Sequence, residues 1–209
     1  FEISDQSLTL AELSRRSGYY KSTILRIAES LDRGGYMLRQ EDGQFRLGPT
    51  LWRLGSMYRQ NFHLAEHIRP ALQEIVEKTN ETASYYVREG NSRVCLYRHS
   101  PQRAIFHVLK EGTRLTLEKG ASAKVLMAWS DDAPNDLKPL REVGYAISMG
   151  ERDPDVAAIS IPLLDQNQKI CGALAVSGLI SRFDEMACQR AIEVLKESAQ
   201  SLALNYVPA

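Results

Sequence analysis

The sequence predicts an α+β protein that starts with a winged helix-turn-helix, continues through a linker helix and ends in an antiparallel sheet domain flanked by helices. Three observations lead to this fold class. Two short helical stretches precede a pair of strand-like runs within residues 9–48. An apolar helical repeat follows a proline in residues 49–60. Alternating strand-like runs then lie between two amphipathic helical segments.

The first helical stretch has clear boundaries. Thr9 suits the N-cap, Glu12 takes the third helical position of a capping box, and Gly18 can end the helix in the left-handed conformation. A second helix is expected over residues 21–31. Its apolar positions recur at helical spacing and predict one buried stripe, made of Ile24, Ile27, Ala28 and Leu31.

A hairpin is expected directly after the second helix. Residues 36–39 and 44–47 read as short strands, and the turn between them contains an Asp-Gly pair, which is typical of hairpins. Helix, turn, helix and hairpin together predict a winged helix-turn-helix domain over residues 1–48, a module that inserts a helix into the DNA major groove. The core of such a domain has one further helix, which we expect upstream of Phe1.

Residues 49–62 are expected to form a linker helix. Pro49 suits the first helical position. One side of the helix is apolar and needs a partner, either the N-terminal domain or a second subunit; it carries Leu51, Leu54, Met57 and Tyr58.

Residues 63–209 are expected to form the second domain. The apolar pattern predicts a helix near each end, at residues 65–79 and 184–204. Strands are expected at residues 82–88, 93–98, 104–109, 156–164 and 169–177. A loop of small residues at 119–122 leads into a helix at 123–129, and a helix end near residue 141 turns into a strand by residue 148.

Composition excludes several classes of protein. The chain has 209 residues, 44% of them hydrophobic, and 26 basic residues balance 26 acidic ones. No apolar run reaches the ~20 residues of a membrane span, so no membrane partner is expected and the protein is expected to be cytoplasmic. The three cysteines are scattered, which fits reduced thiols. Residues 1–60 hold nine basic and seven acidic residues, which mildly favours the N-terminal part as the DNA-facing end.

With these segments placed, the chain resembles the IclR family of bacterial transcriptional regulators. The first stretch that carries the resemblance runs from Leu8 through Lys21-Ser22-Thr23 to Phe45-Arg46-Leu47-Gly48. The second comprises residues 112–117 and 120–128, and the third comprises residues 144–151, 159–163 and 173–178. Each stretch is weak alone, but their order over nearly the whole chain is specific.

The resemblance implies a winged helix-turn-helix joined by a linker helix to a GAF/PAS-like effector domain, assembled as a homodimer or a dimer of dimers. It also implies a double-stranded, pseudo-palindromic operator and a small organic acid effector. The chain departs from the family between residues 130 and 143, where the family has a longer helical stretch.

The DNA-binding face is expected on the second helix and the hairpin. Lys21 and Ser22, at the helix start, would hold phosphates, and Arg26, one turn on, would reach a base edge. A solvated face of a protein-interaction module is the plain alternative. The expected contacts are Tyr20, Lys21, Ser22, Thr23, Arg26, Arg39, Gln44 and Arg46.

The effector site is expected where the small-residue loop opens the next helix, since amide groups at a helix start can bind an anionic head group. A loop that is small only for packing is the plain alternative. The resemblance implies a pocket with few polar positions and hence an acid with an apolar or aromatic body. The expected lining is Phe106, Leu117, Gly120, Ala121, Ser122, Met149, Ala158, Ala175 and Ser177.

Other functions are weaker readings of the same residues. A hydrolase using Ser122 or Cys95 lacks a matched base and orienting acid, so no enzyme activity is expected. His63 and His67 stand four residues apart without a third ligand, so neither a metal nor a cofactor is expected. An orphan regulator, whose second domain only oligomerises, is the main rival hypothesis.

Overall fold

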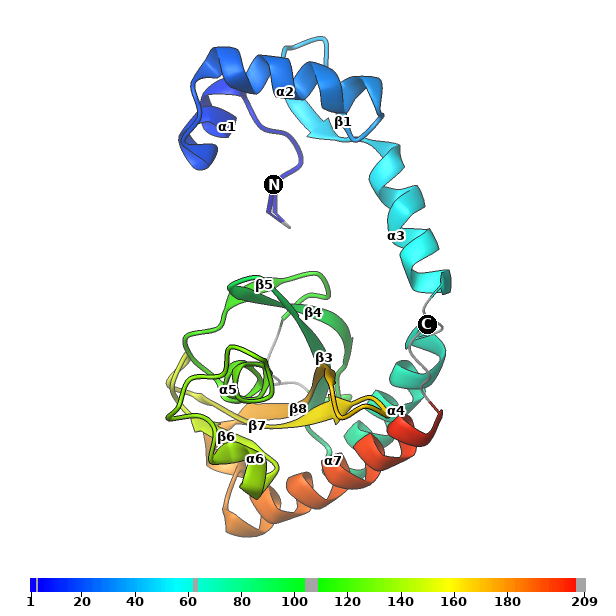
Figure 1. Ribbon diagram of the computed structural model, residues 1–209, viewed down its shortest axis with the longest axis vertical. Coiled ribbons are helices and arrows are strands. Elements are labelled where there is room, and N and C mark those ends of the chain that lie inside the picture. The colour runs from blue at the N-terminus through cyan, green and yellow to red at the C-terminus, as the bar shows by residue number, and fades with distance from the viewer. Residues whose placement is uncertain (3, 62–63, 104–108, 206–209) are drawn as a thin grey trace. The chain divides into compact units, whose positions relative to one another are not determined.

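The structure, a computed structural model, describes residues 1–2, 4–61, 64–103 and 109–205. The chain divides into two compact units, Phe1–Phe62 and His63–Ala209, which we call the N-terminal and C-terminal units (Figure 1). None of the helices in the described part of the chain is long and apolar enough to cross a membrane.

The N-terminal unit contains the two expected short helices. Helix α1 spans Leu10–Ser17 and helix α2 spans Lys21–Arg33. The capping box is confirmed: Thr9 Oγ1 accepts from the Glu12 amide, and the Glu12 carboxylate accepts from the Thr9 amide at 2.8 Å. Gly18 ends α1 with φ of +75°, as expected.

One position of the expected stripe on α2 was wrong. Ile24 and Ala28 are buried and Leu31 is half-buried, whereas Ile27 is 41% exposed. Helix α2 packs against α1 and β1, and its buried residues are Ile24 and Ala28.

The expected hairpin is confirmed as β1, Met37–Arg39, paired antiparallel with β2, Phe45–Leu47. Gly43 takes a φ of +79° in the turn. The strand pair has an unexpected third partner, because Leu8 and Phe45 exchange two backbone hydrogen bonds at 2.8 Å and are both buried. Helix α3, Pro49–Asn61, follows β2.

The C-terminal unit is built on one six-stranded antiparallel sheet in the order β5-β4-β3-β8-β7-β6. Its strands are β3 (Thr82–Glu89), β4 (Ser92–His99), β5 (Arg114–Thr116), β6 (Ala146–Met149), β7 (Val156–Leu164) and β8 (Ile170–Leu179). The strand expected at 104–109 falls mostly outside the described residues.

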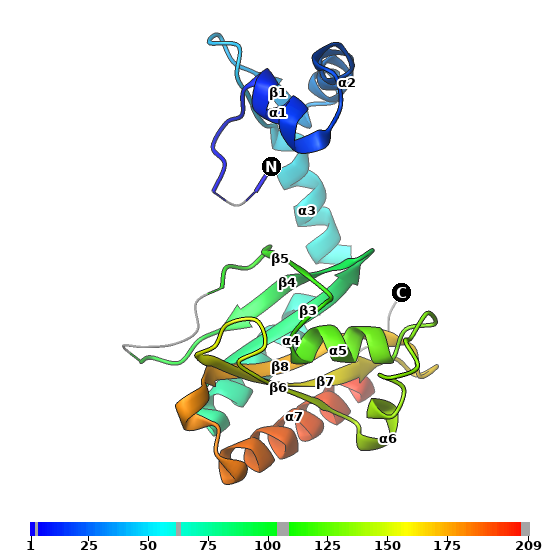
Figure 2. The same ribbon diagram turned by 90° about the vertical axis from the view of Figure 1, so that its left-hand side faces the viewer.

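Helices cover both faces of this sheet (Figures 1 and 2). Helices α4, Leu64–Thr79, and α7, Glu185–Asn205, pack together on one face, and helix α5, Ala121–Ala128, lies on the other. A short helix α6, Leu140–Val143, follows α5, and a single 3₁₀ turn, Ile180–Arg182, precedes α7. Helix α5 begins two residues earlier than expected.

The two faces of the sheet differ in side-chain size. Along β8, Leu174 and Val176 join the core beneath α4 and α7, while Ala173 and Ala175 join the cluster beneath α5. Successive strand residues point to opposite faces, so the alternation of large and small residues gives a filled core on one side and room for a cavity on the other.

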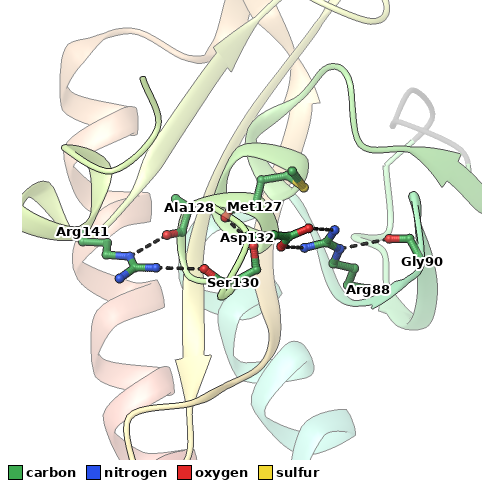
Figure 3. Close-up of polar contacts among 7 residues, drawn as sticks. All are labelled: Arg88, Gly90, Met127, Ala128, Ser130, Asp132 and Arg141. Atoms are coloured by element: carbon green, nitrogen blue, oxygen red, sulfur yellow. Dashed lines mark hydrogen bonds and ion pairs between the residues drawn. The ribbon is translucent and has the colours of Figure 1, made fainter. Parts of the chain in front are cut away.

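The end of α5 is fixed by two arginines (Figure 3). Arg141 donates to the carbonyl oxygens of Ala128 at 2.6 Å and Ser130 at 3.0 Å, where a helix has unpaired carbonyls and favours a cation. Arg88 forms a bidentate pair with Asp132 at 2.6 and 2.8 Å, which ties the β3–β4 hairpin to the loop after α5. This ion pair holds the pKa of Asp132 below its usual value.

Close packing of Gly172 under Tyr85 offers a test of the fold. A methyl group on Gly172 would lie 2.4 Å from the ring of Tyr85, which is 1% exposed and donates to the Cys171 carbonyl at 2.8 Å. Gly172→Ala should therefore lower the free energy of unfolding by about 1–3 kcal/mol, measured by urea denaturation. The same change in a Tyr85→Leu background should cost much less, and equal costs in both backgrounds would contradict this packing.

Candidate functional site

A small cavity lies between α5 and the β6–β7–β8 part of the sheet. Ser148, Ala158 and Ser177 occupy neighbouring positions on these three strands and line one wall. Gly120 and Ala121, at the start of α5, line the opposite wall. The cavity measures about 40 Å³, which is room for water but less than the ~150 Å³ that accommodates a benzene ring.

Most of the residues expected to bind an effector line this cavity. Those brought together are Gly120, Ala121, Ser122, Ala158, Ala175 and Ser177. Met149 does not belong to the lining: it is 41% exposed, and the preceding residue, Ser148, faces the cavity, because strand neighbours point to opposite sides. Leu117 packs beside the cavity against the α5 cluster and does not line it. Phe106 lies outside the described residues.

The most important lining residue, Arg93, was missed by the sequence analysis. Its side chain is buried, with the residue 3% exposed, and its Nη1 donates to the carbonyl oxygen of Thr116. The guanidinium lies over the Tyr86 ring, 5.9 Å from the centroid. Its Nε has no hydrogen-bond partner, and no carboxylate pairs with Arg93 in the described part of the chain.

Burial of this guanidinium is reflected in its pKa. Removal from water lowers the pKa of Arg93 to about 10, and the nearby positive charge of Arg152 acts in the same direction. A buried cation without a counter-ion costs free energy, which an anion brought into the cavity would offset.

A second, half-buried arginine adds to the positive potential on this face of the sheet. Arg98 donates to the Ser84 hydroxyl at 2.9 Å, and burial lowers the pKa of its guanidinium. Arg93 and Arg98 reach the same face because Leu96 forms a β-bulge: Tyr85 pairs with Tyr97, but Tyr86 pairs with Cys95.

Gly120 allows the start of α5 to approach Arg93. A Cβ atom at this position would lie 3.1 Å from Arg93 Nη2, and the backbone has a φ of +102°, which L side chains rarely adopt. Both the backbone conformation and the close packing against Arg93 therefore require a glycine at position 120.

The outer wall of the cavity is the loop between β6 and β7, which contributes Arg152 and Asp153. The preceding residue, Glu151, accepts a hydrogen bond from the Gly120 amide at 3.2 Å and forms an ion pair with Lys124 of α5. Lys124 also donates to the Ile147 carbonyl at 3.3 Å. Burial alone would raise the pKa of Glu151, but the hydrogen bonds from Lys124 and Gly120 hold it below the usual value.

A larger cavity of about 400 Å³ lies on the α7 side of the sheet and carries Arg103, Arg182 and Arg190. Two of these arginines already have a carboxylate partner, because Arg182 binds the buried carboxylate of Glu81 at 2.5 and 2.7 Å and Arg103 binds the same carboxylate at 3.3 Å. Arg93 has no such partner among the described residues, so its cavity is the candidate anion site despite the smaller volume.

The expected DNA-binding residues lie on the surface of the N-terminal unit. Six of them are exposed: Tyr20, Lys21, Ser22, Arg26, Arg39 and Arg46. Thr23 is half-buried. Gln44 is half-buried as well, and its amide group is engaged within the chain, accepting from the Ser7 hydroxyl at 2.7 Å and donating to Asp42 at 2.9 Å.

The cysteines do not form a nucleophilic site. Burial raises the pKa of Cys95 to about 11, so its thiolate is scarce at neutral pH. The pKa values of Cys188 and Cys171 are raised too, also by burial. Cys171 is half-buried, and Cys95 and Cys188 are buried.

Comparisons with known proteins agree on one family. The family model described as bacterial transcriptional regulator IclR C-terminal matches residues 56–136 and 133–204. The HTH-type transcriptional regulator BhcR of Paracoccus denitrificans is 26% identical over 96% of this chain and 81% of its own length.

Solved structures show the same fold. A crystal structure of an IclR transcriptional regulator from Silicibacter covers all of this chain and 92% of its own, with a TM-score of 0.86 and 23% identity. An IclR homologue from Microbacterium hydrocarbonoxydans, crystallised with 4-hydroxybenzoate, covers 98% of this chain and 93% of its own, with a TM-score of 0.75 and 21% identity.

Removing the charge of Arg93 tests whether the cation lacks a partner. Arg93→Met removes the cost of desolvating a charge and loses one hydrogen bond, so the free energy of unfolding should stay within about 1 kcal/mol of wild type or rise. Arg182→Met should lower it clearly more, since that change removes the two closest charged hydrogen bonds of the buried Glu81 carboxylate. A large loss with Arg93→Met, measured in the same urea titration, would show that Arg93 has a counter-ion.

Proposed function

This chain belongs to the IclR family of bacterial transcriptional regulators, and we propose that it binds operator DNA through the N-terminal unit and a small organic acid through the C-terminal unit. The acid alters operator binding, so the protein reports the concentration of a metabolite to transcription. One observation supports the acid most strongly: Arg93 is buried beside the cavity without a carboxylate partner in the described residues.

An acid with an apolar or aromatic body fits the walls of the cavity. Ala121, Ala158 and Ala175 offer methyl groups, and the Tyr86 ring offers an aromatic surface. Ser122, Ser148 and Ser177 supply hydroxyl groups at the edge. The complex of the Microbacterium homologue with 4-hydroxybenzoate agrees with this class of ligand, although its low identity supports only the fold.

The N-terminal unit would act as a winged helix-turn-helix, with α2 as the recognition helix and the β1–β2 hairpin as the wing. Arg26 is exposed one turn into α2 and would contact a base edge, while Lys21 at the helix start would contact a phosphate. Arg39 and Arg46 are exposed on the wing and would contact the DNA backbone or the minor groove. Because the Gln44 amide group is bonded to Ser7 and Asp42, it would position the wing instead of contacting DNA.

The exposed apolar face of α3 supports assembly in pairs. Trp52 is 74% exposed on this helix. Leu51, Leu54 and Met57 are also exposed. Covering these side chains in a second copy would give two DNA-binding units and hence an operator of two half-sites. The effector would then act through a coupling between sites, typically about 1–3 kcal/mol.

The cavity's small volume also supports the rival function, an orphan regulator whose C-terminal unit only oligomerises. About 40 Å³ holds no organic acid without movement of a wall. This reading and the effector hypothesis differ in whether an acid binds at all.

Titration calorimetry with 4-hydroxybenzoate, benzoate and glycolate tests the effector, with 4-hydroxybenzyl alcohol as the neutral control. At least one aromatic acid should bind, and the alcohol should not. Arg93→Met should weaken acid binding at least tenfold, because a charge-assisted interaction is lost. The bound acid should change affinity for a duplex selected from random DNA by about 5–150-fold. Equal binding of acid and alcohol would contradict an anion site, and no binding by any acid would favour the orphan regulator.

Two α2 variants test the DNA-binding face by fluorescence anisotropy on the selected duplex and a scrambled one. Arg26→Ala should cost about 1–3 kcal/mol on the selected duplex and little on the scrambled one. Lys21→Ala should weaken binding to both duplexes alike and reduce the salt dependence by about one ion. Equal losses on both duplexes in both variants would sink the assignment of Arg26 to a base edge.

A further inference from the structure

We infer that Glu151 is an internal carboxylate that competes with the effector, and that Lys124 is the cation that receives the effector's carboxylate once Glu151 is displaced. The inference rests on the proposed function and specifies how the cavity admits and recognises its acid. Neither residue was among those expected at the site.

Glu151 makes the contacts that an acid ligand would make at this place. One carboxylate oxygen accepts from the Gly120 amide at 3.2 Å, and the other accepts from the Lys124 ammonium. The amide belongs to the N-cap residue of α5, an eight-residue helix whose positive end favours an anion. The effector's head group is expected near these amides, and the chain's own carboxylate already binds there.

The second observation that points to a ligand is Arg93. Its residue is 3% exposed, its Nε is unpartnered, and it lines the cavity that Gly120 also lines. Its Nη2 would lie 3.1 Å from a Cβ on Gly120. An anion beside Gly120 is therefore within reach of two cations. Glu151 bonds to Lys124 and has no ion pair with Arg93 in the described residues. Because Glu151 does not pair with Arg93, the guanidinium can still attract the carboxylate of a ligand.

The small volume of the cavity requires a wall to move before an acid can enter. A ring-sized acid needs more than three times the ~40 Å³ that the cavity offers. The wall formed by Arg152 and Asp153 directly follows Glu151 in the chain, so releasing Glu151 removes one tie between this wall and the start of α5. Gly150, with φ of +68°, begins the loop.

The ion pair is suited to exchange because it is only partly buried. The side chains of Lys124 and Glu151 are 32% and 29% exposed, and pairs at such depth contribute little net stability. An incoming carboxylate can replace Glu151 on Lys124 while Glu151 returns to water. The exchange leaves Lys124 paired in both arrangements and brings negative charge near Arg93.

Calorimetry with 4-hydroxybenzoate on three variants tests the inference. Glu151→Gln removes the competing charge and keeps an oxygen for the Gly120 amide, so affinity should rise about three- to tenfold. Lys124→Met should lower affinity at least tenfold, even though it also frees Glu151. Glu118→Gln, at an exposed position two residues before Gly120, is the matched control and should leave affinity unchanged.

Hydrogen–deuterium exchange gives a readout that needs no ligand. Uptake over residues 148–156 should increase in Glu151→Gln and in Lys124→Met, and stay at the wild-type level in Glu118→Gln. Unchanged uptake in the first two variants would overturn the role of the ion pair in closing the loop.

The outcomes separate this inference from the proposed function. If 4-hydroxybenzoate binds wild type but Glu151→Gln binds no more tightly, Glu151 is structural and the inference fails while the effector function stands. If Lys124→Met binds as tightly as Glu151→Gln, Lys124 is not the receiving cation. If no variant binds 4-hydroxybenzoate, benzoate or glycolate, the proposed effector function fails, and the inference fails with it.

Discussion

The burial of Arg93 without an acidic partner is the constraint on which the C-terminal unit's chemistry depends. A guanidinium taken out of water must be hydrogen-bonded, paired or compensated by a ligand. Here Arg93 Nη1 donates to the Thr116 carbonyl and the guanidinium lies over the Tyr86 ring, but no carboxylate pairs with it among the described residues. Arg93 therefore lacks a counter-ion among the described residues, and an anionic effector is the simplest group that could supply one.

Several features of the fold place Arg93 in this environment and shape the cavity beside it. The bulge at Leu96 places two arginines on the face covered by α5, and small residues on β7 and β8 leave space beneath that helix. Gly120 lets the helix start approach Arg93, while Arg141 holds the helix end through the Ala128 carbonyl. The start of α5 is thus held against the cavity, and the partly exposed pair of Lys124 and Glu151 is the weaker element around it. We therefore expect the β6–β7 loop to move more readily than α5 when a ligand enters.

The parts that sequence reasoning predicted well are those set by local interactions. The capping box at Thr9, the left-handed Gly18 and the turn at Gly43 follow from neighbours a few residues away, and the structure confirms each. Six cavity residues were predicted because they lie in short stretches of small residues that resemble the IclR family. Such signals depend on spacing along the chain, which a sequence displays directly.

The missed features depend on register. Strict alternation along β4 would send Arg93 and Arg98 to opposite faces. Only the bulge at Leu96, which forms against Tyr85 and Tyr86 of β3, brings them to the same face. A shift by one residue on β6 likewise exchanged Met149 for Ser148. Ile27 repeats at helical spacing, but whether a helical position is covered depends on tertiary neighbours. Unpaired burial of a charge cannot be read from one residue's identity, since it requires knowing every group around it.

Anomalous diffraction from crystals soaked in 4-bromobenzoate tests the central claim most directly, because it locates the anion without assuming which cavity holds it. The account places the bromine signal between α5 and the β6–β7–β8 part of the sheet, with the ligand carboxylate within hydrogen-bond distance of Arg93 or Lys124 and Glu151 turned away from the Gly120 amide. A bromine signal confined to the cavity of Arg103, Arg182 and Arg190, with Glu151 still bonded to Gly120 and Lys124, would contradict it.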